Sequence, residues 1–156
     1  MMNNDEQRSL GSGPNARSVP HEIVPGELHR DLTQVIIGVF YQVYNELGQG
    51  FLESVYERAM VILLEEFELL VERQKPISVY FRNRRVGDFR IDLLVERSVA
   101  LELKVCRSLD PVHEAQLLNY LRATDLEVGL VLNFGEKPEV RRLVLTSDRK
   151  RGPVRD

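Results

Sequence analysis

The segment VALELKVC, residues 99–106, constrains the fold more than any other stretch of this chain. Its apolar residues alternate with Glu102 and Lys104, which is the pattern of a β-strand with one face toward a core. A carboxylate and an ammonium group that leave water each cost several kcal/mol unless they are paired or bound. The strand therefore predicts either an ion pair or a site that faces a cleft.

Size and composition are those of a single soluble domain. The chain has 156 residues, 43% hydrophobic and 29% charged, which is long enough to bury a core. No apolar run approaches the ~18–20 residues that span a bilayer, and the first residues lack the apolar segment of a secretion signal. The single cysteine, Cys106, excludes an internal disulfide. We therefore expect a cytoplasmic protein without a membrane partner.

Apolar periodicity predicts two helices at the start of the ordered chain. The first covers residues 28–47 and stops at Gly48-Gln49-Gly50, where glycine takes a left-handed conformation cheaply. The second covers residues 52–69, and its expected apolar stripe is Val55, Ala59, Ile62, Leu63 and Phe67. Residues 1–25 lack periodicity and are expected to be a disordered leader.

The rest of the chain predicts strands and one more helix. Pro76 is expected to mark the change to β structure, with strands at 77–82, 86–96 and 99–106. Asp110-Pro111 predicts the start of a helix, which two strands at 127–135 and 140–146 follow. The order ααβββαββ indicates an α/β (α+β) fold with a central mixed β-sheet flanked by helices. Residues 26–147 are expected to form one domain, and 148–156 a basic tail.

Hydrophobic matching predicts the register between the second and third strands. A three-residue loop at 96–98 pairs Val95 with Val99 and places Asp92 opposite Glu102, whereas a two-residue loop breaks the match. The matched apolar sets are Ile91, Leu93 and Val95 on one strand and Leu101, Leu103 and Val105 on the other. Opposed Cβ atoms lie ~4.5–5.5 Å apart, so the two carboxylates repel unless a proton or a cation lies between them.

Facing carboxylates predict a site for a hard divalent cation, Mg²⁺ or its substitute Mn²⁺. The backbone carbonyl of Leu103 would supply a further oxygen ligand. Lys104 would orient an attacking water or stabilise charge on a phosphoryl oxygen. The alternative that the spacing leaves open is a salt bridge from Lys104 to Asp92 or Glu102 on an exposed face.

Three motifs in this chain resemble those of a known superfamily and of a family that is grouped with it. Asp92 followed after nine residues by Glu102-Leu103-Lys104 resembles the PD-(D/E)xK signature of the restriction-endonuclease-like superfamily, although Ile91 replaces its proline. Gln116 and Tyr120 resemble the Q-x3-Y motif of the exonuclease branch. The segment GFLESVY, residues 50–56, is similar to the motif that names the small bacterial GxxExxY proteins. The resemblance covers about residues 30–146.

The resemblance implies a restriction-endonuclease-like core and a Mg²⁺-dependent nuclease that hydrolyses DNA or RNA with a metal-activated water. It implies catalytic roles for Asp92, Glu102, Lys104 and Glu53, the three acids also holding the metal. Supporting roles are expected for Gln116, Tyr120, Tyr56 and His113. Five of these residues have structural alternatives. Glu53 could be a helix-terminal acid and Tyr56 a core aromatic. Gln116 and Tyr120 could form a polar helix edge, and His113 could have a structural role in the first turn of its helix. The alternative function is a catalytically silent module that binds nucleic acid or protein.

Charge is distributed unevenly along the chain. Residues 137–156 hold seven Lys or Arg against three acids, a net +4, while the whole chain carries −3. A basic segment of this kind can contact phosphate, and a solvated terminus is the alternative. Weak nucleic-acid contacts are therefore expected from Arg141, Arg142, Arg149, Lys150 and Arg151. A homodimer is compatible with the sequence.

Overall fold

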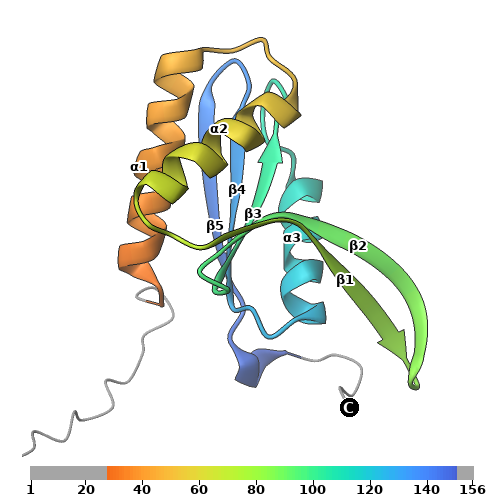
Figure 1. Cartoon of the computed structure of the whole chain (residues 1–156). Coiled ribbons are helices and arrows are strands. Elements are labelled where there is room, and N and C mark those ends of the chain that lie inside the picture. Colours follow the sequence, from red (N-terminus) through yellow and green to blue (C-terminus); the bar gives the residue numbers. More distant parts are fainter. Residues whose placement is uncertain (1–27, 151–156) are drawn as a thin grey trace, which may run out of the picture.

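A computed structural model describes residues 28–150 (Figure 1). The expected leader, the end of the basic tail and Arg151 lie outside the described residues. The elements in chain order are α1 (Arg30–Leu47), α2 (Glu53–Glu66), β1 (Val71–Phe81), β2 (Arg84–Val95), β3 (Val99–Lys104), α3 (Pro111–Ala123), β4 (Val128–Phe134), β5 (Pro138–Val144) and a 3-10 helix, Ser147–Arg149. This order is the predicted ααβββαββ.

The five strands form one mixed sheet in the order β1-β2-β3-β4-β5. Strand β3 pairs with β4 in parallel, because α3 carries the chain back between them, and the other neighbours are antiparallel. Helices α1 and α2 lie on one face of the sheet, and α3 lies on the other (Figure 1). The expected α+β fold with a mixed sheet between helices is confirmed. No helix within residues 28–150 is long and apolar enough to cross a membrane.

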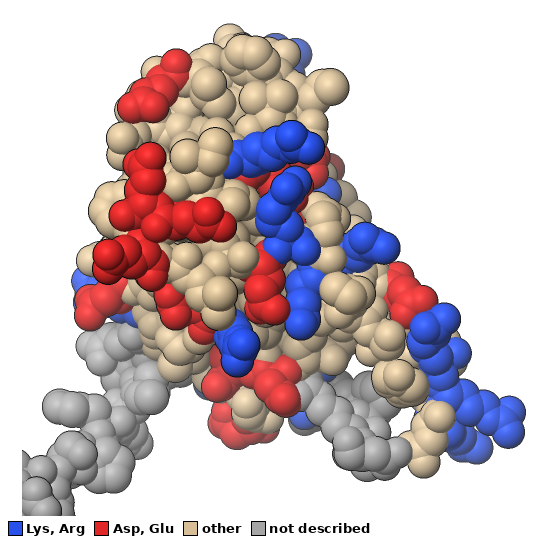
Figure 2. All heavy atoms as spheres, viewed as in Figure 1, with Lys and Arg blue, Asp and Glu red and all other residues tan. Residues whose placement is uncertain are grey.

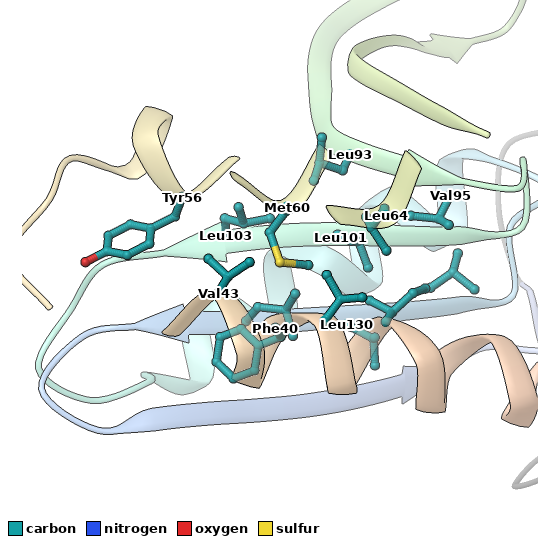
Figure 3. Close-up of a cluster of buried hydrophobic side chains, with 14 of the residues drawn as sticks. Phe40, Val43, Tyr56, Met60, Leu64, Leu93, Val95, Leu101, Leu103 and Leu130 are labelled. Carbon is teal, nitrogen blue, oxygen red and sulfur yellow. The ribbon is translucent and has the colours of Figure 1, made fainter. Parts of the chain in front are cut away.

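The larger hydrophobic core fills the space between α1, α2 and the sheet (Figure 3). Leu101 and Leu103 of β3 are fully buried there, as their alternation with charged residues predicted. Aromatic rings close one end: Tyr56 stacks on Phe134 at 4.5 Å, and Phe40 meets Phe134 edge-on at 4.7 Å. A smaller core, between the sheet and α3, contains Ile91, Ala100, Leu117, Tyr120 and Val131.

The predicted apolar stripe of α2 was right only in part: Ala59 and Leu63 pack against the core, whereas Val55, Ile62 and Phe67 are exposed. The residues that face the core are Tyr56, Met60 and Leu64, each one turn after the last, while Ile62 and Phe67 are 62% and 53% exposed. Apolar residues occur on more than one face of this helix, so periodicity alone could not fix its rotation. The stacking of Tyr56 on Phe134 indicates which face turns inward.

Two strand boundaries also differ from the prediction. Strand β1 begins at Val71, so Pro76 lies inside it rather than before it. An edge strand tolerates proline because one side of its backbone needs no partner, and β1 is the edge of this sheet. Strand β3 ends at Lys104, so Val105 leaves the predicted core face and is 39% exposed.

Candidate active site

The predicted register of the β2–β3 hairpin is confirmed. Val95 pairs with Val99 and Leu93 pairs with Leu101 across a loop of three residues, 96–98. Two residues of this loop, Glu96 and Arg97, adopt left-handed conformations with φ of 52° each, which lets so short a loop reverse the chain. Continuing this register brings Asp92 to the level of Glu102.

The two strands separate where the charged residues begin. Backbone pairing ends at Leu93 and Leu101, and the next free N–H of β3, that of Leu103, donates to Oδ2 of Asp92 at 2.8 Å. The Asp92 carboxylate thus lies in the gap between β2 and β3. The sequence predicted that Ile91 and Leu93 share one face of β2, and this was wrong. Ile91 packs in the core beside α3, whereas Leu93 packs in the core beside α1 and α2.

Glu102 is the most unusual side chain of the site. It is only 4% exposed, and its Oε1 atom has no hydrogen-bond partner among the described residues. Burial, and then the nearby charge of Asp92, raises the pKa of Glu102 to about 8. A buried carboxylate with an unpartnered oxygen is costly, and such groups are concentrated at functional sites.

Asp92 and Glu53 belong to the same electrostatic cluster. Burial raises the pKa of both carboxyl groups, and the charge of Asp92 raises that of Glu53 further. Glu53 is the first residue of α2 and is exposed, and the charges of Asp92 and Lys104 both act on its carboxyl group. The charges of these acids act on one another, since the charge of Asp92 raises the pKa of Glu53 and of Glu102, and the charge of Glu53 also raises that of Glu102.

Lys104 stands at the end of β3 and is half-buried. Its charge lowers the pKa of Glu53, Asp92 and Glu102, which opposes the effect of burial on each. No ion pair joins Lys104 to a carboxylate in the described part of the chain. The salt bridge that the sequence left open as an alternative is therefore not formed.

Sequence reasoning missed Glu57. This residue lies one turn after Glu53 on α2, is 6% exposed, and accepts hydrogen bonds from Arg73 Nε at 3.2 Å and Gln74 Nε2 at 3.0 Å. Gln74 also bonds Asp92 and lowers its pKa, so the network reaches the site. The signal in the sequence was an acid four residues after Glu53, on the same face of a helix.

Tyr56 has a structural position. Its hydroxyl donates to the carbonyl of Gly48 at 2.6 Å and accepts from the N–H of Phe51 at 3.3 Å, and its ring is fully buried. These bonds fix the loop that leads into α2. Tyr56 therefore holds the segment that presents Glu53, and does not itself face the carboxylates.

The expected residues of α3 divide into two groups. Tyr120 is 7% exposed and stacks on Phe89 at 4.2 Å, and burial together with the charges of Glu102 and Asp92 raises its pKa to about 12. Gln116 forms a hydrogen bond with Tyr120 that opposes this rise. Both residues thus border the site.

His113 does not share that position. Its Nδ1 accepts from the N–H of Asp110 at 3.1 Å, while Oδ1 of Asp110 accepts from the N–H of Val112 at 2.9 Å. The two bonds form a capping box at the start of α3. The predicted N-cap and Pro111 are confirmed, and His113 has the structural role that was its alternative.

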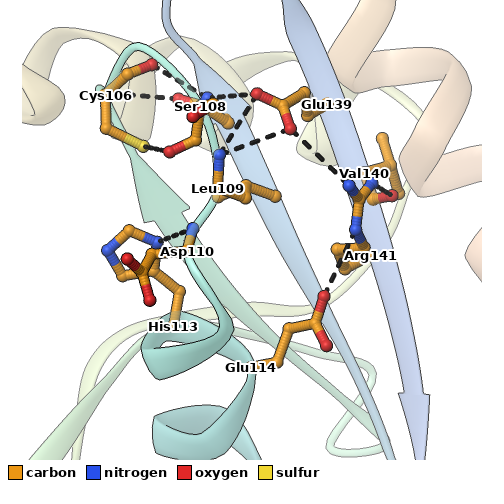
Figure 4. A network of polar contacts seen from close by, with 10 residues as sticks. Cys106, Ser108, Leu109, Asp110, His113, Glu114, Glu139, Val140 and Arg141 are labelled. Atoms are coloured by element: carbon orange, nitrogen blue, oxygen red, sulfur yellow. Dashed lines mark hydrogen bonds and ion pairs between the residues drawn. The ribbon is translucent and has the colours of Figure 1, made fainter.

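A network around Asn133 fixes the loop that follows Lys104 (Figure 4 shows part of it). The fully buried side chain of Asn133 accepts from Cys106 N and Gly135 N, each at 3.0 Å, and donates to Cys106 O at 2.9 Å and Glu139 Oε1 at 3.1 Å. A Cβ atom on Gly135 would lie 1.7 Å from Cys106 O, so only glycine fits there. Lys104 therefore precedes a rigid loop.

Most of the expected basic contacts are used inside the domain. Arg141 pairs with Glu114 at 3.2 Å and with Glu139 at 3.7 Å, and Arg142 donates to the carbonyl of Leu28. Lys150 Nζ donates to the carbonyls of Thr124 and Leu126, just beyond α3. Arg149 is exposed. Three of these basic side chains thus form contacts within the domain.

The donor set fits a hard divalent cation that retains waters. Asp92 and Glu102 offer carboxylate oxygens, one of them unpartnered, and Mg²⁺ is commonly held by one or two carboxylates and waters. The N–H and C=O of one strand residue point to the same side, so the Leu103 carbonyl faces the same gap as its N–H. No cage of three or more His, Cys, Asp or Glu ligands is preformed within residues 28–150.

Comparison with known proteins places the chain in a family. No curated protein matches it. The crystal structure of SSO0001 is similar with a TM-score of 0.49 and 16% identity, over 76% of this chain; the chain spans 59% of the length of that protein. The model of the PD-(D/E)XK nuclease superfamily matches residues 30–143. This chain, with Asp92, Glu102 and Lys104 at its separating strands, belongs to the PD-(D/E)XK nuclease superfamily.

Proposed function

We propose that this protein is a metal-dependent nuclease that hydrolyses phosphodiester bonds of DNA or RNA at Asp92, Glu102 and Lys104. The observation that carries the proposal is the Glu102 carboxylate, which is 4% exposed, lies beside a second carboxylate and has an unpartnered oxygen. A merely structural residue at this position would gain stability by being apolar. A site that binds a cation explains why an acid is present.

The proposed ligands of Mg²⁺ or Mn²⁺ are Asp92, Glu102, the Leu103 carbonyl and, from α2, Glu53. A bound ion of this kind lowers the pKa of its water and neutralises charge on a phosphoryl oxygen. Two of the ligands are held in place by the fold, since Asp92 is bonded to Leu103 N and the Tyr56 hydroxyl fixes the loop before Glu53.

Lys104 would supply a positive charge to the reaction in addition to that of the metal ion. Its ammonium group has no carboxylate partner in the described part of the chain, so it is free to donate to the attacking water or to a phosphoryl oxygen. The Tyr120 hydroxyl, with its pKa of about 12, stays protonated at neutral pH. It would act as a hydrogen-bond donor beside Glu102 and not as a base.

A cleavage assay tests the proposal. Supercoiled, linear and single-stranded DNA and single-stranded RNA are incubated with the full chain and Mg²⁺, Mn²⁺ or a chelator. We expect cutting with metal only, and a loss of about 10²-fold or more in Asp92→Asn and Lys104→Ala. The control Lys137→Ala, in the exposed β4–β5 turn, should cut like the wild type.

Two results would contradict the proposal. Cutting that survives both substitutions would come from a contaminant. Binding of nucleic acid without any cutting, under all metal conditions, would instead support the silent binding module. Membership in the GxxExxY proteins rests on the motif at residues 50–56 and is part of the proposal. A cytoplasmic location and a homodimer stay predictions.

A further inference from the structure

The β1–β2 hairpin extends away from the body of the domain as a two-stranded arm (Figure 1). Its turn is made by Arg82 and Asn83, with φ of 47° and 62°. Beside the turn, Tyr80 is 50% and Phe81 58% exposed. Exposed aromatic rings at the end of a projecting hairpin are a feature of binding surfaces, because water solvates them poorly.

The tip of this arm is strongly basic. Residues 80–90, YFRNRRVGDFR, contain four arginines and one aspartate, a net +3 in a chain whose total charge is −3. Figure 2 shows Lys and Arg side chains gathered at the end of the arm, while Asp and Glu gather over the opposite side of the molecule in the same view.

The arginines on the two faces of the arm differ in whether an acidic side chain pairs with them. Tyr80 pairs across the strands with Arg85, which forms an ion pair with Asp88 at 3.5 Å. Phe81 pairs with Arg84, and the guanidinium of Arg82 lies over the Phe81 ring at 5.4 Å. Neither Arg82 nor Arg84 has a carboxylate partner within residues 28–150. The Phe81 face therefore presents two unneutralised cations beside an aromatic ring.

A site built from carboxylates needs such a surface. Asp92, Glu102, Glu53 and Glu57 repel a phosphate chain until a cation is bound. Arg84 lies eight residues before Asp92 on β2, which is about 27 Å at a rise of ~3.4 Å per residue. Strand β2 therefore carries both Asp92 and Arg84. The distance between them along the strand equals the length of about eight nucleotides of a stacked single strand.

We propose that Phe81, Arg82 and Arg84 form a binding tip for the single-stranded part of a nucleic-acid substrate. The two guanidinium groups hold phosphates, and the Phe81 ring stacks on an unpaired base. The choice of nucleic acid as the ligand rests on the proposed function, but the contacts themselves do not require catalysis. The arm thereby replaces the basic C-terminal segment as the main nucleic-acid contact.

Fluorescence anisotropy tests the binding tip. A labelled 20-nucleotide DNA, the same sequence as RNA, and the DNA duplex are titrated with full-length protein in a Lys104→Ala background, so that no cleavage interferes. The variant Arg82→Gln/Arg84→Gln is compared with Arg30→Gln/Arg97→Gln, which removes the same charge at exposed positions away from the tip. Thermal melting confirms that each variant is folded.

We expect the tip variant to lose about tenfold or more in affinity at 100 mM salt. Its slope of log affinity against log salt should fall by about 1.4, for two lost contacts to a single strand. Phe81→Ala should weaken single-strand binding by about fivefold or more and duplex binding less. Arg84→Lys should retain the salt slope, and the control double variant should stay within twofold.

The outcomes separate this inference from the proposed function. Equal affinities of the tip and control variants, or no binding by any form, would overturn the binding tip even if the wild type cuts. A tip effect in a protein that never cuts would leave the binding tip in place and refute the nuclease. A Phe81→Ala loss that is larger on duplex than on single strand would exclude base stacking.

Discussion

Replacing Glu102 by glutamine should stabilise the metal-free protein, and increasingly so as the pH rises. In the folded state the pKa of Glu102 is raised from 4.5 to about 8, mainly by burial. Between these two values the unfolded chain has lost the proton that the folded chain retains. Stability of the wild type therefore falls as the pH rises through this interval. Glutamine has a similar shape and no charge, so it escapes this loss.

The size of the effect follows from the same interval. At about 1.36 kcal/mol per pH unit, the difference between 4.5 and about 8 corresponds to roughly 3 kcal/mol at pH 7 and approaches roughly 5 kcal/mol above pH 8. The variant and the wild type should be nearly equal at pH 4. At pH 7 the variant should melt about 10 °C higher.

Thermal and urea unfolding in a chelating buffer, from pH 4 to pH 9, measure this difference. The same melts with Mn²⁺ add a second readout, because a ligand that binds only the folded state stabilises it by about 2.7 kcal/mol at a hundred times its Kd. The wild type should gain stability with Mn²⁺, and Glu102→Gln should gain much less. A control, Glu46→Gln on the exposed face of α1, should show neither change.

Two results would contradict this prediction for Glu102. If the gap between Glu102→Gln and wild type does not widen with pH, the carboxylate is not held neutral by burial. If Mn²⁺ stabilises both proteins equally, the cation binds elsewhere. If the stability gained by Glu102→Gln grows with pH but Mn²⁺ does not stabilise the wild type, Glu102 is a buried acid that does not bind the cation.

Three further predictions concern the structure around the site. Tyr56→Phe removes the bond to the Gly48 carbonyl and should lower the free energy of unfolding by about 1 kcal/mol. It should also lower the cleavage rate, because the loop before Glu53 is less well fixed. Urea melts and cleavage assays measure both effects, with Tyr41→Phe, at an exposed tyrosine, as the control. Gly135→Ala places a Cβ 1.7 Å from Cys106 O and should lower the free energy of unfolding by about 2 kcal/mol or more. Gly38→Ala, in α1 with nothing within 4 Å of its Cβ, should instead raise it by up to about 1 kcal/mol. Equal melting temperatures of the two variants would contradict this prediction. Lys150→Gln loses the bonds to Thr124 and Leu126 and should lower the free energy of unfolding by about 1 kcal/mol. Its affinity for nucleic acid should stay within twofold of the wild type. A large loss of affinity would instead indicate that the basic C-terminal segment contacts nucleic acid.

The register of the β2–β3 hairpin could be predicted because hydrophobic matching allows few alternatives. Leu93 and Leu101 must both be buried, and a shift by one residue would expose one of them. The same constraint brought Asp92 to Glu102, and Asp110-Pro111 gave the start of α3 through local chemistry. These features depend on residues that are near in sequence or on a period of two.

The other features depend on contacts that periodicity does not contain. Ile91 and Leu93 have the same parity but pack in different cores, because the sheet is irregular where Asp92 bonds Leu103 N and Gln74 adopts a φ of 50°. Glu57 is explained only once Arg73 and Gln74 are found beside it. A local pattern on α2 could not reveal a network that β1 completes.

The sharpest test of a cation site at Asp92 and Glu102 is to locate the bound cation. Crystals of the full chain are soaked with Mn²⁺, and an anomalous difference map is calculated for wild type and Glu102→Gln. We expect a peak between the strands, at bonding distance from carboxylate oxygens of Asp92 and Glu102, that is absent in Glu102→Gln. A wild-type map without a peak there, or a peak that survives the substitution unchanged, would contradict this expectation.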